Sequence, residues 1–482
     1  MTVYYIYNLM SIIKSISGIR GTIGGEPGNN LTPVEIIKFS SAFGIFIINI
    51  NPQIKSKIIV GRDARISGEM VSRLVIGNLL SQGIDVIDLG VSSTPTVEVA
   101  VSSQKAQGGV IITASHNPGG WNALKLIDEH GEFLSAAAGE KILALAENNQ
   151  PDYVAEDKLG SYFFTPFLEW DHIDKIMELP LIDKEAVSKR DFKIVVDGIN
   201  SIGGKAIPHV LESMGITKVL LLNCSPDGLF AHKPEPLAEN LTEIMERVKS
   251  EKADLGIVVD PDVDRLAFID ENGEMFGEEY TLVAISDYVL ENFAILDDFY
   301  PSLYQKVTVS NLSSSRALRD VTEKHGGKYE AAAVGEVNVV TKMKDIKAII
   351  GGEGNGGVIF PALHYGRDAM LGVALFLSLL AKSNKKMSEL RASLPEYFMV
   401  KDKLELTPNI NVSEILQKIK NEYTGEKITD IDGVKVDWDD SWVHLRASNT
   451  EPIIRIYAEA RTKTEAKTKV DEIKSKILAY IK

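Results

Sequence analysis

Four short polar segments follow apolar runs in this sequence of 482 residues, and each carries side chains that could do chemistry. The first segment, GGVIITASHNPGGWNALK at residues 108–125, ends an apolar run at Ser115 and His116, with Lys125 in reach. Such a serine can act as a nucleophile, because a neighbouring base or cation activates its weakly reactive hydroxyl. The alternative is an ordinary turn, since Asn-Pro-Gly-Gly strongly favours turns.

The second segment, ADLGIVVDPDVDRLAFID at residues 253–270, places Asp260, Asp262 and Asp264 at alternate positions after a β-branched run. Three carboxylates this close would repel one another without a cation, and oxygen ligands suit Mg²⁺ or Ca²⁺. The spacing also fits an EF-hand, but Arg265 stands where that loop requires glycine, and LGIVV reads as a strand. The segment predicts a metal site, with a solvated acidic turn as the alternative.

The remaining two segments have residue types that bind sugars and phosphates. GGEGNGGVIFP at residues 351–361 places Glu353 and Asn355 in a glycine-rich backbone, where a ligand can approach closely and its hydroxyls can be bound. RASNTEPIIR at residues 446–455 offers guanidinium groups, hydroxyls and backbone N–H groups, which suit a phosphate dianion. Its candidate ligands are Arg446, Ser448, Asn449, Thr450 and Arg455. A plain loop and a capped turn are the alternatives.

Together the four segments resemble, in order and spacing, the α-D-phosphohexomutase family, which comprises phosphoglucomutases, phosphomannomutases and phosphoglucosamine mutases. The resemblance covers nearly the whole chain. It implies a phosphoserine at Ser115 and one Mg²⁺ per chain, bound by Ser115, Asp260, Asp262 and Asp264. SGIRG at residues 17–21 is similar to the family's N-terminal signature and would bring Arg20 to the catalytic centre, where the implied catalytic residues are Ser115, His116, Lys125 and Arg20.

The resemblance also implies how substrate is bound. The GE-containing loop would read the sugar hydroxyls, and the R-x-S-N-T-E-P loop would hold the phosphate that is not reacting. The implied substrate-binding residues are Arg265, Glu353, Asn355, Arg446, Ser448, Asn449, Thr450 and Arg455.

The implied reaction moves a phosphoryl group between O6 and O1 of a hexose through a 1,6-bisphosphate. Many relatives read GExSGH in the sugar loop, where this chain has Asn355 and Gly357, while VGEVNVVTKM at residues 334–343 looks closer to the phosphoglucosamine mutases. We therefore expect conversion of glucosamine 6-phosphate to glucosamine 1-phosphate. A phosphoglucomutase/phosphomannomutase of broad specificity is the alternative. A sugar-phosphate phosphatase and a non-catalytic sugar-phosphate binding protein are more remote alternatives.

Bulk properties agree with a cytoplasmic enzyme. The net charge of −15 and the pI near 5.2 argue against nucleic acid or an anionic membrane as partner. The resemblance implies a small hexose phosphate as the partner. The single cysteine, Cys224, fits a reducing compartment. We expect a monomer or homodimer. The longest apolar run, Ala369–Ala381, is too short to span a membrane and predicts a buried helix.

Apolar strand-like runs alternate with helical patterns, which predicts α/β architecture with mixed sheets and crossover helices. The resemblance implies three similar mixed-sheet α/β domains plus a smaller α+β C-terminal domain around a central cleft. The expected divisions are an N-terminal extension at residues 1–10, a phosphoserine domain at 11–165, a metal-binding domain at 166–270, a sugar-binding domain at 271–395 and a phosphate-binding domain at 396–482.

Overall fold

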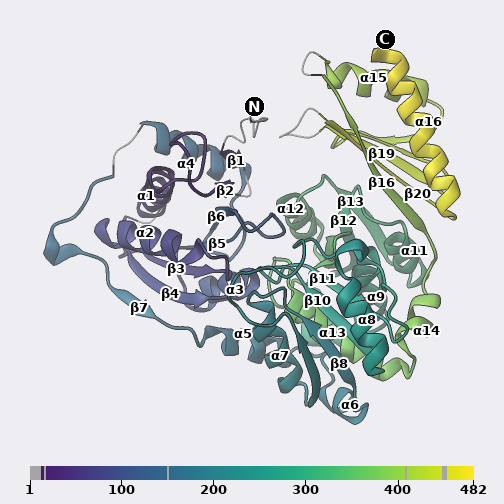
Figure 1. The fold of residues 1–482 in the computed structure, drawn as a ribbon, viewed down its shortest axis with the longest axis horizontal. Helices are drawn as coiled ribbons and strands as arrows, with labels where there is room; N and C mark the ends of the chain where they lie inside the picture. Colours follow the sequence, from purple (N-terminus) through teal and green to yellow (C-terminus); the bar gives the residue numbers. More distant parts are fainter. Residues whose placement is uncertain are drawn as a thin grey trace, which may run out of the picture. The chain divides into compact units, whose positions relative to one another are not determined.

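The computed structural model describes residues 12–15, 18–50, 52–148, 151–407, 410–447 and 453–481. The chain divides into two compact units, the first formed by Met1–Thr281 and Gly356–Ser388, the second by Leu282–Asn355 and Glu389–Lys482. Strands alternate with helices along most of the chain (Figure 1). The expected α/β fold, with mixed sheets in three domains and a smaller C-terminal domain, is confirmed.

The first unit contains a seven-stranded mixed sheet. Its strands are β1 (Ile13–Ser15), β2 (Gly18–Thr22), β3 (Lys57–Arg62), β4 (Asp85–Val91), β5 (Gly108–Ile112), β6 (Trp121–Ile127) and β7 (Tyr162–Phe164), and its helices are α1 (Pro33–Ile50), α2 (Gly68–Ser81), α3 (Thr94–Ser103) and α4 (Ala136–Asn148), followed by a short 3₁₀ turn, Glu156–Lys158. The order is β1-β2-β6-β5-β3-β4-β7. Strands β5, β3, β4 and β7 are parallel, while β6, β2 and β1 are antiparallel. Strand β5 is buried throughout, as its apolar sequence predicts.

A second sheet in this unit has the order β11-β10-β8-β9, with only β11 antiparallel to its neighbour. Its elements are β8 (Lys193–Asp197), β9 (Lys218–Leu222), β10 (Leu255–Val259), β11 (Leu266–Ile269), α5 (Leu168–Met177), α6 (Lys184–Lys189), α7 (Gly203–Ser213) and α8 (Thr242–Glu251), with a 3₁₀ turn at Ala238–Asn240. The strand expected at LGIVV is confirmed as β10.

The segment Gly356–Ser388 adds β15 (Gly357–Ile359) and α13 (Ala369–Ser383) to the first unit. The sequence analysis predicts this segment to be part of the sugar-binding domain at residues 271–395. Helix α13 contacts α5, α6 and α7, and its residues 369–381 are all buried, which confirms the predicted buried helix. Phe376 of α13 stacks on Phe268 with 3.9 Å between ring centroids and meets Phe276 edge-on at 5.2 Å. This aromatic contact holds α13 to β11.

The second unit begins with parallel strands in the order β13-β12-β14. Its first elements are β12 (Gln305–Asn311), β13 (Lys328–Ala332), β14 (Ala348–Glu353), α10 (Phe293–Phe299), α11 (Ala317–Lys324) and α12 (Glu336–Ile346). Two helices, α9 (Glu278–Glu291) and α14 (Met387–Ala392), begin within the first unit and end within the second.

The C-terminal sheet is antiparallel throughout, in the order β16-β20-β19-β18-β17. Its elements are β16 (Phe398–Glu405), β17 (Lys427–Thr429), β18 (Val434–Asp437), β19 (Trp442–Ala447), β20 (Ile453–Ala460), α15 (Val412–Glu422) and α16 (Lys463–Ile481). Helix α16 lies along β16 and β20 (Figure 1). Alternate apolar residues of β20, such as Ile454 and Ile456, join the core with α15 and α16, so the opposite face of the sheet can carry polar side chains.

Helix α1 is long and apolar enough, by length and composition, to cross a membrane, so the expectation that no segment reaches that length is wrong for this helix. The run is less obvious in the sequence because Glu35 and Lys38 interrupt it. Half of helix α1 is buried inside the unit, and residues such as Phe39 and Phe43 form part of the core. A core helix of a globular domain has the same length and composition.

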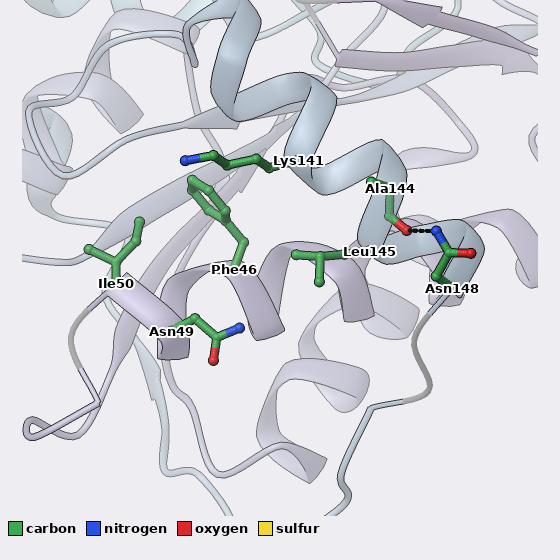
Figure 2. Close-up of a pocket in the computed structure, with 7 residues that line it drawn as sticks. All are labelled: Phe46, Asn49, Ile50, Lys141, Ala144, Leu145 and Asn148. Carbon is green, nitrogen blue, oxygen red and sulfur yellow. Dashed lines mark hydrogen bonds between the residues drawn. The ribbon is translucent and has the colours of Figure 1, made fainter.

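Figure 2 shows a shallow groove between α1 and α4. Three of its lining residues come from α1 and four from α4: Phe46, Asn49, Ile50, Lys141, Ala144, Leu145 and Asn148. No residue that the sequence predicts to do chemistry is among them.

We expect Phe376→Ala to destabilise the first unit by about 3–5 kcal/mol, because it removes a buried aromatic side chain and leaves a cavity beside Phe268. Phe167→Ala is the matched control, since that side chain is 72% exposed and its loss leaves no cavity. Urea titration followed by fluorescence and circular dichroism would measure both. Equal shifts of the unfolding midpoint in the two variants would contradict the assignment of Phe376 to the core.

Candidate active site

Ser115 lies in the loop between β5 and β6, three residues after the buried end of β5 at Ile112. Its backbone is left-handed, with φ of 46°, a conformation that few residues other than glycine adopt. The N–H of Ser115 donates to Thr113 Oγ1 at 2.9 Å. A strained backbone at a polar residue is a feature of functional sites, where the surrounding contacts hold it in place.

Arg65 holds the serine loop in place. Its guanidinium donates to the carbonyl oxygens of Ser115, Asn117, Pro118 and Trp121, and to Asp63 Oδ2 at 3.0 Å. The side chain is fully buried. The planar fork of arginine can satisfy several carbonyl groups at once, which a lysine cannot. The loop conformation at Ser115 therefore depends on a residue that lies 50 positions earlier.

The aspartate loop begins where β10 ends, and it meets the serine loop directly. Ser115 Oγ donates to Asp260 Oδ2 at 2.7 Å. The other oxygen of Asp260 accepts the N–H groups of Asp264 and Arg265, each at 3.1 Å. Val263 within the loop has φ of 63°, which is rare for a β-branched residue. The predicted nucleophile and the predicted metal loop are thus in contact.

Two buried cations face the aspartates. Lys125 Nζ, from β6, lies 2.7 Å from Asp262 Oδ2 and 3.7 Å from Asp264 Oδ2. Arg367, which precedes α13, donates to Asp264 Oδ2 at 2.6 Å. Thr94 Oγ1 at the start of α3 donates to Asp262 Oδ2 at 2.8 Å. Elements far apart in the sequence therefore converge on one acidic loop.

Burial and these charges set the protonation of the cluster. Burial, followed by the charges of Asp264 and Asp262, raises the pKa of Asp260 well above its usual range. Burial acts in the same direction on Asp262, but Lys125 outweighs it and holds the pKa of Asp262 below its usual range. The same ion pair outweighs burial at Lys125 and raises its pKa, so the amine is protonated. Ionisation of all three carboxylates at once is therefore unfavourable unless a further cation lies among them.

The donor set fits a hard divalent cation. Asp260, Asp262 and Asp264 can each offer one oxygen, and these oxygens lie within 4.8 Å of one another. Within the part of the chain that the structure describes, the buried Oδ1 atoms of Asp262 and Asp264 have no hydrogen-bond partner. An unpartnered buried carboxylate oxygen is costly, and Mg²⁺ takes such oxygens as ligands.

Of the other predicted catalytic residues, His116 lies beside Ser115 and Arg20 contacts the same loop. His116 Nδ1 is 3.4 Å from Ser115 Oγ, and burial, followed by the charges of Arg265 and Arg20, lowers the pKa of His116 to about 2. The imidazole is therefore neutral. Arg20, on β2, donates from Nη1 to Asn117 Oδ1 at 2.8 Å. Arg265 follows the aspartates and is largely buried, with Nη1 3.6 Å from Glu235.

The predicted sugar residues lie in the second unit, where Glu353 ends β14. Glu353 Oε1 accepts the Asn311 amide at 2.8 Å and the Gly335 N–H at 3.2 Å. Asn355 Nδ2 lies 3.5 Å from Glu353 Oε2. The VGE segment at residues 334–336 thus borders Glu353, although the two are separated in the sequence.

The predicted phosphate residues that the structure describes are Arg446 on β19 and Arg455 on β20, directly opposite each other in the antiparallel register. Ser448, Asn449 and Thr450 lie outside the described residues. Two like charges in opposite positions are unfavourable, and Asp432 partly offsets them by contacting Arg446 Nε at 2.8 Å. Asp432 also accepts the N–H of Val334 at 3.0 Å, which connects the arginines to the VGE segment.

Arg65, Thr94 and Arg367 contact the site, yet the motifs did not identify them. Gly-Arg-Asp-Ala occurs twice, at residues 61–64 and 366–369, and includes Arg367. This repeat is the feature of the sequence that could have identified Arg367 as a site residue. Nothing in the local pattern distinguishes Thr94.

Four consecutive family models match the chain. They describe the α/β/α domains I, II and III of phosphoglucomutase/phosphomannomutase, at residues 12–152, 171–273 and 279–398, and its C-terminal domain at residues 400–476. The matched ranges cover most of the sequence. The domain boundaries given in the sequence analysis remain predictions.

Whole-length relatives match as well. A phosphoglucomutase/phosphomannomutase of Thermococcus kodakarensis is 36% identical over 93% of this chain and 95% of its own. A phosphoglucosamine/phosphogalactosamine mutase of Sulfurisphaera tokodaii is 35% identical over 96% of this chain and 99% of its own. The crystal structure of a phosphoglucomutase/phosphomannomutase family protein from Burkholderia thailandensis shares the fold, with a TM-score of 0.80 at 23% identity, covering 97% of both chains.

We expect Mg²⁺ to raise the thermal unfolding temperature, because an ion that binds only the folded state stabilises it, by about 2.7 kcal/mol at a hundredfold excess over Kd. Asp262→Asn removes one ligand charge at nearly constant size and should lose most of this gain. Asp298→Asn, an exposed aspartate outside the cluster, is the control. Calorimetry with and without Mg²⁺ measures the effect, and an unchanged response in Asp262→Asn would exclude this cluster as the site.

Proposed function

Because the chain belongs to the phosphoglucomutase/phosphomannomutase family and is a phosphohexomutase, we propose that it interconverts glucosamine 6-phosphate and glucosamine 1-phosphate through a phosphoserine at Ser115. The observation that carries this proposal is the hydrogen bond from Ser115 Oγ to the buried carboxylate of Asp260. It supports Ser115 as the phosphoryl carrier, because it sets that hydroxyl against the three-aspartate cluster.

Phosphorylation of Ser115 would add about 1.5–2 negative charges next to these carboxylates. Mg²⁺ bound by Asp260, Asp262, Asp264 and a phosphoserine oxygen would supply the positive charge that phosphoryl transfer requires. Lys125 adds a fixed positive charge from within the protein. Its position against Asp262 and Asp264 suits stabilisation of the oxygens of the transferring group.

In the first half-reaction, the bond between phosphorus and Ser115 Oγ breaks, and a bond forms to the free hydroxyl oxygen of the hexose phosphate. The hydroxyl proton passes to a base of the protein, and an acidic group of the protein gives a proton to the departing serine oxygen. His116, Lys125 and Arg20 are the candidates for these transfers. His116 Nδ1, 3.4 Å from Ser115 Oγ, is favoured by its position, while the protonated amine of Lys125 lies against Asp262 and carries a proton.

In the second half-reaction, the 1,6-bisphosphate turns over and its other phosphoryl group returns to Ser115. The sugar leaves as the isomeric monophosphate, and no water is consumed. We assign the phosphoryl transfer to residues of the first unit. Recognition of the sugar and of the non-reacting phosphate is assigned mainly to residues of the second unit, with Arg265 of the first as a further substrate contact.

Arg446 and Arg455 are suited to the non-reacting phosphate, since guanidinium groups bind phosphate oxygens in pairs. Ser448, Asn449 and Thr450 belong to the same proposed set. Glu353 carries a negative charge that would favour an ammonium group at C2 over a hydroxyl, and Asn355 offers both a donor and an acceptor. The VGE segment beside Glu353 supports the amino-sugar assignment.

The two relatives of nearly equal identity carry names with different sugars. Broad specificity for glucose and mannose phosphates is therefore the second candidate. The glycine at position 357 favours it, because a side chain that could enforce one sugar orientation is absent there. A phosphatase would need water in place of the sugar hydroxyl and would form no bisphosphate.

We predict that intact-mass analysis of the purified protein shows an adduct of roughly 80 Da, the mass of one phosphoryl group, that Ser115→Ala lacks. The alanine variant should have little mutase activity, because no other group takes over the role of carrier. Ser103→Ala, an exposed helical serine, should retain both adduct and activity. Substantial activity in Ser115→Ala would show that the phosphoserine mechanism is wrong.

We predict a higher kcat/KM for glucosamine phosphate than for glucose or mannose phosphate, measured as initial rates on the 1- or 6-phosphates. Glu353→Gln should reduce this preference by about tenfold or more, because a charge-assisted hydrogen bond contributes about 1.5–3 kcal/mol. Glu330→Gln is the control, because this carboxylate lies on β13, two strands away from β14, and pairs with Lys328 and Lys342. A tenfold preference for glucose or mannose phosphate would overturn the amino-sugar assignment and leave the phosphohexomutase assignment intact.

A further inference from the structure

The first unit contains a second group of potential metal ligands that the mutase chemistry does not use. It consists of His172 on α5, His364 in the loop before α13, and Asp368 at the N-cap of α13. All three side chains are buried. Their candidate ligand atoms lie within 4.8 Å of one another, and none belongs to the three-aspartate cluster.

Both imidazoles point the same nitrogen at one carboxylate oxygen. His172 Nε2 lies 2.9 Å from Asp368 Oδ2, and His364 Nε2 lies 3.3 Å from the same atom. In a tetrahedral zinc site with bonds of about 2.0–2.1 Å, neighbouring ligand atoms are about 3.3–3.4 Å apart. Two of the three separations are therefore close to those of such a site, and a water molecule can take the fourth position.

The atoms behind these ligands are arranged as they are around metal-bound histidines. His172 Nδ1 lies 3.0 Å from Thr96 Oγ1, and His364 Nδ1 lies 3.4 Å from Glu98 Oε2. The second oxygen of Asp368 accepts the N–H groups of Met370 and Leu371. Metal-binding histidines characteristically use their other ring nitrogen to contact a carboxylate, carbonyl or water, which fixes the ring orientation.

We propose that His172, His364 and Asp368 bind a structural divalent ion of the zinc class, with Glu98 holding the ring of His364. Binding of the ion would displace the protons that the two Nε2 atoms direct at Asp368. Two neutral imidazoles, the carboxylates of Glu98 and Asp368, and one divalent ion would then sum to zero charge, which suits a buried site. Imidazole nitrogen is a preferred ligand of zinc, whereas Mg²⁺ prefers oxygen. The two ions proposed for this chain therefore differ in their ligands, with zinc at the two imidazoles and Asp368, and Mg²⁺ at the three aspartates.

The ion would lie behind the catalytic loop and hold two of its supports. Thr96 is in the first turn of α3, two residues after Thr94, which donates to Asp262. Asp368 directly follows Arg367, which donates to Asp264. A bound ion would therefore join α3, α5 and the start of α13 at the rear of the aspartate cluster.

The test is metal analysis of full-length protein expressed with zinc supplementation and dialysed into Mg²⁺ buffer. We expect about one zinc per chain in the wild type and in Asp262→Asn, which disrupts the aspartate cluster instead. His172→Gln and His364→Gln should lose it. Glu98→Gln should weaken zinc binding by about 10–100-fold. His130→Gln, an exposed histidine, is the control that keeps it.

Wild-type crystals measured at the zinc absorption edge provide a test that no variant's folding can affect. We expect an anomalous peak bounded by the three side chains. No peak there, or zinc that disappears in Asp262→Asn but persists in His172→Gln, would overturn the proposal and leave a hydrogen-bonded ion-pair network in its place. Mutase activity with Mg²⁺ does not enter these readouts, so this result is independent of the proposed function.

Discussion

Three carboxylates buried in one loop place the strongest constraint on the first unit, because a charge removed from water must meet an opposite charge or a proton. Lys125 meets Asp262, and Arg367 meets Asp264. Lys125 and Asp262 are 137 residues apart, and Arg367 and Asp264 are 103 residues apart. Neutralising this loop therefore draws distant segments together, and it explains in part why residues 356–388 belong to the first unit.

A chemistry could be assigned to each polar segment from sequence because each segment follows a strand, where side chains leave the core and can meet a ligand, and these assignments stay predictions. The alternation of apolar runs with helical patterns likewise predicted the α/β fold. That Ser115 meets Asp260 did not follow from either pattern. The resemblance to a family implied it, since local spacing contains no information about contacts between separate loops.

The residues that sequence reasoning missed act through tertiary contacts. Arg65 follows β3 and binds carbonyl groups of a loop about 50 residues later, a role that depends on the strand order β5-β3. In the second unit, Asp432 connects Arg446 with Val334. Each of these residues looks like an ordinary surface charge in the sequence. Only the fold shows that Arg65 donates to carbonyl groups of the serine loop, and that Asp432 contacts Arg446, which lies opposite Arg455.

The left-handed backbone at Ser115 restricts which amino acid can supply the hydroxyl. Threonine has the same functional group, but its branched Cβ crowds the backbone and disfavours a positive φ. Cysteine is unbranched, but it would place a larger, softer sulfur against Asp260 where an oxygen now donates a hydrogen bond. For the proposed phosphoryl carrier, backbone geometry therefore restricts the side chain as much as reactivity does, and serine satisfies both.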